Sequence, residues 1–82
     1  MKYPVYSYRD IKVAFGGPIV EMNDQTAIRG FAYAINQNEG LMNFSPKDYD
    51  LYRIGEFDTE KGILIPEKVP VLVMSGVSAV EV

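Results

Sequence analysis

The sequence predicts an α+β domain in which one amphipathic helix packs on a small antiparallel sheet, in the order strand, helix, strand, strand. Three features predict it: an aromatic opening segment, one stripe of apolar residues at helical spacing, and a hairpin signal in the second half. The 82 residues fit a single domain, 1–82, with one core. On folding, a chain near this length buries only about 60% of the surface that its unfolded form exposes.

The first expected element is a strand over residues 2–8. Its aromatic and β-branched residues, the types enriched in strands, are Tyr3, Val5, Tyr6 and Tyr8. The run Phe15-Gly16-Gly17-Pro18 then interrupts the chain, because paired glycines reach positive φ and a proline disfavours helix at the residue before it. A loop is expected from there to about Met22. The glycine pair lacks the Lys and Ser/Thr of a phosphate-binding loop.

A helix is expected over residues 24–37. Asn23 and Asp24 are good N-cap types, and Asn38-Glu39-Gly40 is expected to end the helix. The apolar stripe, at spacings of three and four, consists of Ala27, Ile28, Phe31, Ala32 and Ile35. Gly30 costs this helix up to about 1 kcal/mol against Ala, so either a neighbouring backbone passes close by or the site is simply tolerated.

The second half predicts a hairpin. After a short apolar connection over residues 41–44, Ser45-Pro46-Lys47-Asp48 has the residue order of a one-turn helix. Strands are expected over 49–57 and 63–65, joined by a turn in which Gly62 is free to take positive φ. The segment 69–82 is apolar but contains Pro70 and Gly76, so three readings stay open: an edge strand, a short helix, or a tail that another subunit covers.

The expected core places the helical stripe against the apolar residues of the sheet. Those residues are Val5, Leu51, Ile54, Phe57, Ile63 and Ile65.

Composition argues against catalysis. The chain has no Cys and no His, which removes thiolate chemistry, the commonest metal ligand and the commonest general base. No cofactor and no metal are therefore expected, and the protein is expected not to be an enzyme. The acidic residues of the second half are read as a solvated hairpin tip in preference to a metal site or a catalytic carboxylate pair: Asp48, Asp50, Glu56, Asp58 and Glu60.

Charge and hydropathy give a first indication of partners. The formal charge of −3 argues against a generalised basic surface for duplex nucleic acid. No apolar run approaches the roughly 20 residues that a membrane span needs, and no signal-peptide pattern is present. We therefore expect a cytoplasmic protein that does not bind membranes, and a homo-oligomer, since neither disulfides nor metals are there to stabilise so small a core.

Five residues are candidates for contact with nucleic acid because they combine flat rings with cations. They are Arg9, Arg29, Tyr33, Tyr52 and Arg53. Proteins that bind single strands stack bases on aromatic rings, while Lys or Arg follows the phosphates. For any single tyrosine, a ring in the core or at a subunit contact is the commoner alternative.

Three segments together resemble a known family. They are KYPVYSYRD at 2–10, NDQTAIRGF at 23–31 and SPKDYDLYRIGEFD at 45–58, which runs on to Gly62. The combination resembles the small nonstructural protein of gokushovirus-type microviruses, which are phages with single-stranded circular DNA. The resemblance implies a protein that acts in the host cytoplasm and assists genome replication or the switch to single-stranded DNA synthesis. It assigns no chemical role to any residue.

Two main hypotheses of function follow. The first is a nonenzymatic phage accessory protein that binds single-stranded DNA or phage and host replication proteins. The alternative is an interaction module that self-associates and docks on a host or viral protein through the segment 69–80 and an exposed strand edge. An enzyme that uses only Asp, Glu, Lys or Tyr is a third, minor possibility. Convergence of Arg9, Arg29 and Arg53 on one concave face would favour nucleic acid, and their scatter would favour the interaction module.

Overall fold

The computed structural model describes residues 1–37 and 40–80. In chain order the elements are β1 (Lys2–Asp10), β2 (Ala14–Phe15), β3 (Ile19–Val20), α1 (Asp24–Asn36), α2 (Leu41–Phe44), the one-turn 3-10 helix η1 (Pro46–Asp48), β4 (Tyr49–Asp58), β5 (Ile63–Ser75) and α3 (Gly76–Ala79). The predicted α+β class is confirmed. The short strands β2 and β3 lie where the sequence predicted only a loop, and α2 occupies the expected apolar connection.

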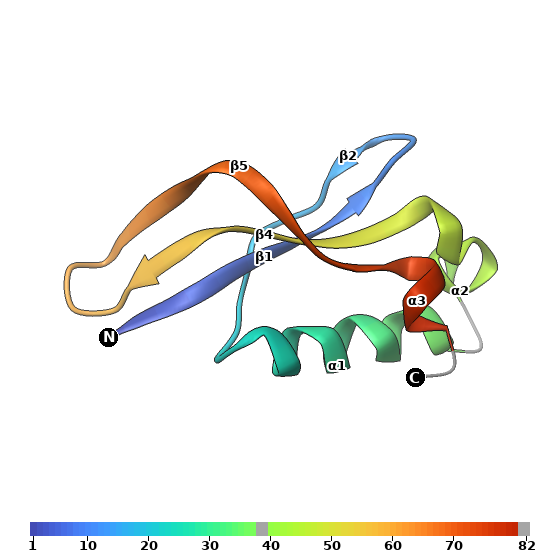
Figure 1. Cartoon of the computed structure of the whole chain (residues 1–82), viewed down its shortest axis with the longest axis horizontal. Coiled ribbons are helices and arrows are strands. Elements are labelled where there is room, and N and C mark those ends of the chain that lie inside the picture. The colour runs from blue at the N-terminus through green and yellow to red at the C-terminus, as the bar shows by residue number, and fades with distance from the viewer. Residues whose placement is uncertain (38–39, 81–82) are drawn as a thin grey trace.

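The sheet is antiparallel throughout, with the order β2-β1-β4-β5, and β3 also pairs with β1. Helix α1 runs along one face of this strongly twisted sheet, and α2 and α3 gather at one end of the molecule (Figure 1). The predicted hairpin is confirmed: β4 and β5 pair directly, and Gly62 in their turn has φ +68°. The opposite face of the sheet is left without a covering helix among the described residues.

Helix α1 forms where the apolar stripe predicted it. Asn23 caps it, since its side chain accepts a hydrogen bond from the Thr26 amide while the Thr26 hydroxyl accepts one from the Asn23 amide. The helix ends at Asn36, one residue earlier than expected, and Asn38 and Glu39 of the expected end lie outside the described residues. Among the described residues, Gly30 has no close backbone neighbour outside the helix. A Cβ there would lie 3.7 Å from the Tyr8 hydroxyl.

Strand β5 is far longer than the predicted 63–65. It continues to Ser75, so most of the segment 69–82 is an edge strand followed by the short helix α3, and residues 81–82 lie outside the described residues. Pro70 does not end the strand because residues 67–70 are unpaired there: Pro66 pairs with Gly55 and Val71 pairs with Arg53. A proline in such a bulge removes no ladder hydrogen bond.

The core is smaller than predicted and is confined to one end of the sheet. Buried residues that cluster there are Tyr6, Ala27, Phe31, Ala32, Ile35, Tyr49, Leu51 and Ala79. Ile63, expected in the core, is 48% exposed, so that prediction is wrong. The other sheet residues expected in the core divide: Leu51 is in the cluster, Val5 is buried outside it, and Ile54, Phe57 and Ile65 are only partly buried. On the helix, Ile28 is the one residue of the predicted stripe that is only partly buried.

Element length explains this misplacement. The 13 residues of α1 extend about 20 Å at 1.5 Å per residue, whereas the 10 residues of β4 extend about 33 Å. The helix therefore covers only part of the sheet, and the hairpin end of β4 and β5 projects beyond it. The 39 Å length of the molecule, against 22 Å and 17 Å in the other directions, reflects this overhang.

Candidate nucleic-acid interface

Two of the five predicted residues meet on the sheet face that α1 does not cover. Directly opposed residues of antiparallel strands point to the same face: Arg9 on β1 opposes Phe15 on β2, and Ser7 on β1 opposes Tyr52 on β4. Ser7 and Arg9 are two positions apart on β1, so both pairs lie on one face of the sheet. The Arg9 guanidinium lies over the Phe15 ring, 5.3 Å from its centroid. The Phe15 and Tyr52 rings meet edge to face with centroids 5.4 Å apart. We call Arg9, Phe15 and Tyr52 the outer-face cluster.

The glycine-rich loop holds Phe15 in this position. The Gly16 amide donates to the Tyr8 carbonyl oxygen at 2.8 Å, and the Ser7 hydroxyl donates to the Gly16 carbonyl oxygen at 2.9 Å. A Cβ at Gly16 would lie 3.2 Å from the Tyr8 oxygen, closer than an ordinary contact, so a larger residue would push the loop away from β1. The loop that the sequence indicated only as an interruption therefore places an aromatic ring beside Arg9.

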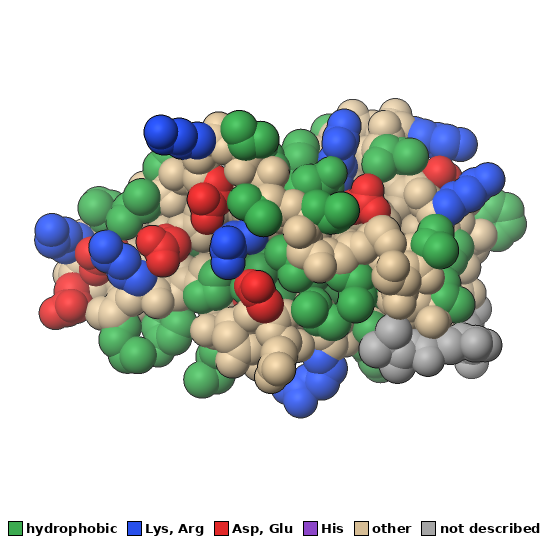
Figure 2. All heavy atoms as spheres, in the orientation of Figure 1, with side chains coloured by type: hydrophobic (Ala, Val, Ile, Leu, Met, Phe, Trp, Pro, Cys, Tyr) green, Lys and Arg blue, Asp and Glu red, His purple; other side chains and the backbone are tan. Residues whose placement is uncertain are grey.

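The outer-face cluster has the chemistry of a small stacking site. Phe15 is 42% exposed, and both Tyr52 and Arg9 are partly exposed, so the rings and the cation are open to a ligand. Lys and Arg side chains lie along the same margin of the molecule, over β5 and over the β1–β2 hairpin (Figure 2). Asp50 on β4 is the cross-strand neighbour of Arg9 on β1, and its carboxylate reduces the net positive charge of the site. Stacking should therefore contribute more to binding here than phosphate attraction.

Arg29 and Tyr33 form a second pair, on the outer side of α1. They lie one helical turn apart, both are exposed, and both line two open hollows on the helix surface. The buried face of α1, with Phe31 and Ile35, lies against the sheet. This pair is thus separated from the outer-face cluster by the helix and the sheet.

Arg53 lies between the sheet and the start of α1, where carboxylates offset its charge. Its Nη1 atom is 3.7 Å from Oδ1 of Asp24, and its Nε atom is 3.3 Å from Oε2 of Glu67. The Nε atom is buried and lacks hydrogen-bond geometry, so its link to Glu67 is an ion pair only. The hollow beside it is lined by three carboxylates and this one guanidinium, a balance that disfavours phosphate.

The three arginines therefore lie in three places and do not converge on one concave face. Arg9 and Tyr52 come together, Arg29 and Tyr33 come together elsewhere, and Arg53 is paired with acids. Phe15 was missed by sequence reasoning. The signal that could have found it is the spacing of Arg9 and Phe15 across a tight turn, which makes them cross-strand neighbours in a hairpin.

Other ionisable groups have structural partners. Burial and a hydrogen bond to Asp24 raise the pKa of Tyr6, and burial raises the pKa of Tyr49. The backbone amides of Lys61 and Glu60 donate to Asp58 and hold the pKa of its carboxyl below 3.8, so this acid caps the hairpin turn. Within residues 1–37 and 40–80, no three acidic side chains are placed to hold a metal ion.

A model of the Phage ORF5 protein family matches residues 3–79, nearly the whole chain. The chain belongs to the Phage ORF5 protein family. The match establishes a phage protein family and does not by itself specify a gokushovirus or another microvirus. It extends from β1 to α3 and so includes all three residues of the outer-face cluster. No curated protein and no solved structure matches the chain. None of the helices in the described ranges has the length and apolar character needed to cross a bilayer.

Proposed function

We propose that this Phage ORF5 family member is a nonenzymatic accessory protein of a microvirus that binds single-stranded DNA during genome replication. The observation that carries the proposal is the outer-face cluster, in which three strands place a cation 5.3 Å and a second ring 5.4 Å from the centroid of the accessible Phe15 ring. The family match supports a phage accessory role, and the resemblance to the nonstructural proteins of gokushoviruses supports the link to single-stranded DNA.

The geometry supports single strands over duplex DNA. Stacking on Phe15 or Tyr52 requires an unpaired base, whose flat face is free. Duplex binding depends mainly on neutralising many phosphates, and a chain with a formal charge of −3 and one cation at the site offers little of that. We therefore expect weak, sequence-tolerant binding to single strands, with modest dependence on salt.

The direct test is fluorescence anisotropy of a labelled oligo-dT strand at low salt. Alanine substitution at Phe15 or Tyr52 should weaken binding roughly 5- to 150-fold, since each stacked base contributes about 1–3 kcal/mol. Arg9→Gln should reduce the slope of log K against log salt by about 0.7, the value for one phosphate contact on a single strand. Tyr33→Ala is the control, because it removes a ring that is even more exposed than Phe15 but lies on the outer side of α1.

Unchanged affinity in the Phe15 and Tyr52 variants would contradict the assignment of the site. Absence of any anisotropy change with wild-type protein at low salt would remove direct DNA binding altogether. Circular dichroism spectra should be compared first, so that a loss of affinity is not mistaken for unfolding.

A second candidate function is a protein-interaction module that docks on a phage or host replication protein. Two observations favour it: the three arginines are scattered, and β5 is an edge strand with exposed apolar residues at Val69, Val71 and Leu72. Under this alternative, oligo-dT would not bind, and substitution of Leu72 by Lys would abolish association with the partner while leaving the fold intact. The anisotropy titration therefore separates the two candidates.

A further inference from the structure

One end of the molecule carries an apolar knob. Phe44 in α2 is 81% exposed, Leu41 is 65% exposed, and Val13 at the tip of the β1–β2 turn is 81% exposed. All three border the same open hollow while staying largely exposed, although Val13 is about thirty positions from the other two in the chain. Exposed apolar side chains that gather from separate segments mark contact sites more often than scattered ones do. We call Val13, Leu41 and Phe44 the knob.

The opposite half of the molecule contains an apolar pocket. Its volume is about 370 Å³, and its lining residues are Val5, Pro18, Ile54, Gly55, Glu56, Leu64, Ile65 and Pro66. For scale, an apolar cavity of about 150 Å³ holds a benzene ring. Gly55, one of the lining residues, lies where β4 and β5 approach closely: a Cβ there would lie 2.5 Å from the Ile65 carbonyl oxygen, so a side chain at this position would distort the pocket wall.

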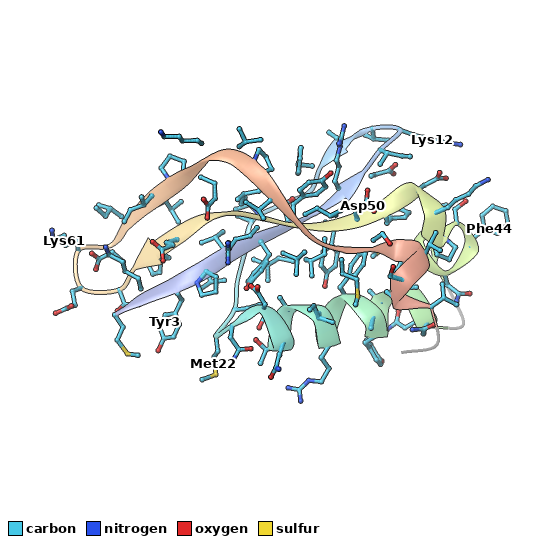
Figure 3. The ribbon with its side chains drawn as sticks, viewed as in Figure 1. Tyr3, Lys12, Met22, Phe44, Asp50 and Lys61 are labelled. Carbon is cyan, nitrogen blue, oxygen red and sulfur yellow. The ribbon has the colours of Figure 1, made fainter. Side chains whose placement is uncertain are left out.

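The knob and the pocket cannot meet within one chain. Phe44 lies at one end of the long axis, and the β4–β5 turn, marked by Lys61, lies at the other (Figure 3). The pocket lies beside that turn, since Leu64 and Glu56 are only a few residues from it on β5 and β4. The molecule is 39 Å long, so a Phe44 ring that enters such a pocket must come from a second copy.

Charge at the two sites is complementary. Lys47 follows Phe44 closely in the chain and is exposed, while Glu56 lies on the rim of the pocket and is also exposed. Neither has an ion-pair partner in the part of the chain that the structure describes. A second copy that inserts Phe44 into the pocket would bring an unpaired cation to an unpaired carboxylate, which favours the encounter and fixes its direction.

We propose that the chain self-associates head to tail, with the knob of one copy in the apolar pocket of the next and Lys47 facing Glu56 across the contact. Such a contact joins two different surfaces, so a pair of copies keeps one free knob, on one copy, and one free pocket, on the other. The association therefore continues into chains or closes into a ring. It involves neither the outer-face cluster nor the outer side of α1, and it does not depend on DNA binding.

The test is a complementation experiment by sedimentation velocity without DNA. Wild-type protein should grow in size with concentration. Phe44→Asp destroys the knob and Leu64→Asp destroys the pocket, and each variant alone should associate at least about 30-fold more weakly, as for loss of an interface hot spot. An equimolar mixture of the two should form one-to-one heterodimers and nothing larger, because one intact knob and one intact pocket remain. Tyr33→Asp, an exposed ring outside both surfaces, should associate as wild type does.

A charge exchange tests the ion pair separately. Lys47→Glu should weaken association several-fold by placing two carboxylates together, and adding Glu56→Lys to the same chain should restore it. Three results would overturn the proposal: a wild-type protein that stays monomeric at millimolar concentration, single variants that still associate, or a mixture that stays monomeric. Failure here leaves the oligo-dT result unaffected, and failure to bind oligo-dT leaves this contact unaffected.

Discussion

The hydroxyl of Tyr6 donates a hydrogen bond to Oδ1 of Asp24, which joins the middle of β1 to the first turn of α1. The same carboxylate oxygen lies 3.7 Å from Nη1 of Arg53 on β4. Asp24 also lies at the helix N-terminus, where the helix dipole favours negative charge. One carboxylate thus ties the helix to two strands of the sheet, and these contacts fix how the helix lies on the face opposite the outer-face cluster.

Tyr6→Phe should lower the free energy of unfolding by about 1–2 kcal/mol. A hydrogen bond to a charged group contributes roughly 1.5–3 kcal/mol, and the low end applies because Asp24 is half exposed and keeps its contact with Arg53. Urea denaturation followed by circular dichroism measures this. As the control, Tyr33→Phe removes an exposed hydroxyl from α1 and should change the free energy of unfolding by less than about 0.5 kcal/mol.

Alkaline pH should destabilise the protein through its buried tyrosines. Burial raises the pKa of Tyr6, Tyr8 and Tyr49 above the ordinary value of 10.0, so the folded state holds these protons more tightly than the unfolded state does. Their contribution is fully present below pH 10.0 and is lost as the pH rises above it. Unfolding free energies measured from pH 8 to 12 should therefore fall above about pH 10. The decrease in unfolding free energy should be smaller in Tyr6→Phe than in the wild-type protein. An equal decrease in the two proteins would contradict the contribution of Tyr6.

Gly76→Ala should cost about 3 kcal/mol or more, a large part of the 4–12 kcal/mol expected for a chain of this size. A Cβ at Gly76 would lie 1.9 Å from the Pro46 carbonyl oxygen and 2.5 Å from that of Tyr49. Only backbone movement could relieve the clash, and α3 would lose its place beside η1. Gly17→Ala is the control, because a Cβ there meets nothing within 4 Å. Equal melting temperatures for the two variants would show that α3 does not pack as described.

Phe31→Ala should cost about 3–5 kcal/mol, enough to unfold much of the population. The Phe31 side chain is fully buried, and its ring centroid lies 5.2 Å from that of Tyr8. Differential scanning calorimetry measures the expected fall in melting temperature. The exposed Tyr33, two positions along α1, provides the comparison: Tyr33→Ala should melt close to wild type. An unchanged melting temperature for Phe31→Ala would mean that the buried face of α1 is misassigned.

Local sequence patterns located the main helix and the main strands correctly, but they did not predict how long each strand is. The stripe that includes Phe31 and the turn signal at Gly62 each depend on a few adjacent residues, so α1 and the β4–β5 hairpin could be located. The length of β5 could not, because Pro70 is tolerated only through a bulge whose register depends on β4. In the sequence Gly76 indicates only an interruption of the apolar segment, whereas the structure shows a close approach of two backbones that no local pattern reveals.

The candidate site was predicted in part for the same reason. Residue type predicts Arg9 and Tyr52, and strand pairing places both beside Phe15. Residue type predicts Arg53 equally, but its long-range ion pairs with Asp24 and Glu67 offset its charge. Residue type indicates which chemistry is available, and only the fold decides which side chains share a surface.

Titration of ¹⁵N-labelled protein with oligo-dT, followed by amide chemical shifts at low salt, tests the central claim most directly. Binding at the outer-face cluster predicts that the largest chemical-shift changes occur at the amides of Arg9, Phe15 and Tyr52, while the amide chemical shifts of Arg29 and Tyr33 do not change. Shifts centred on α1, or no shifts with excess oligonucleotide, would contradict the claim that this face of the sheet binds single-stranded DNA.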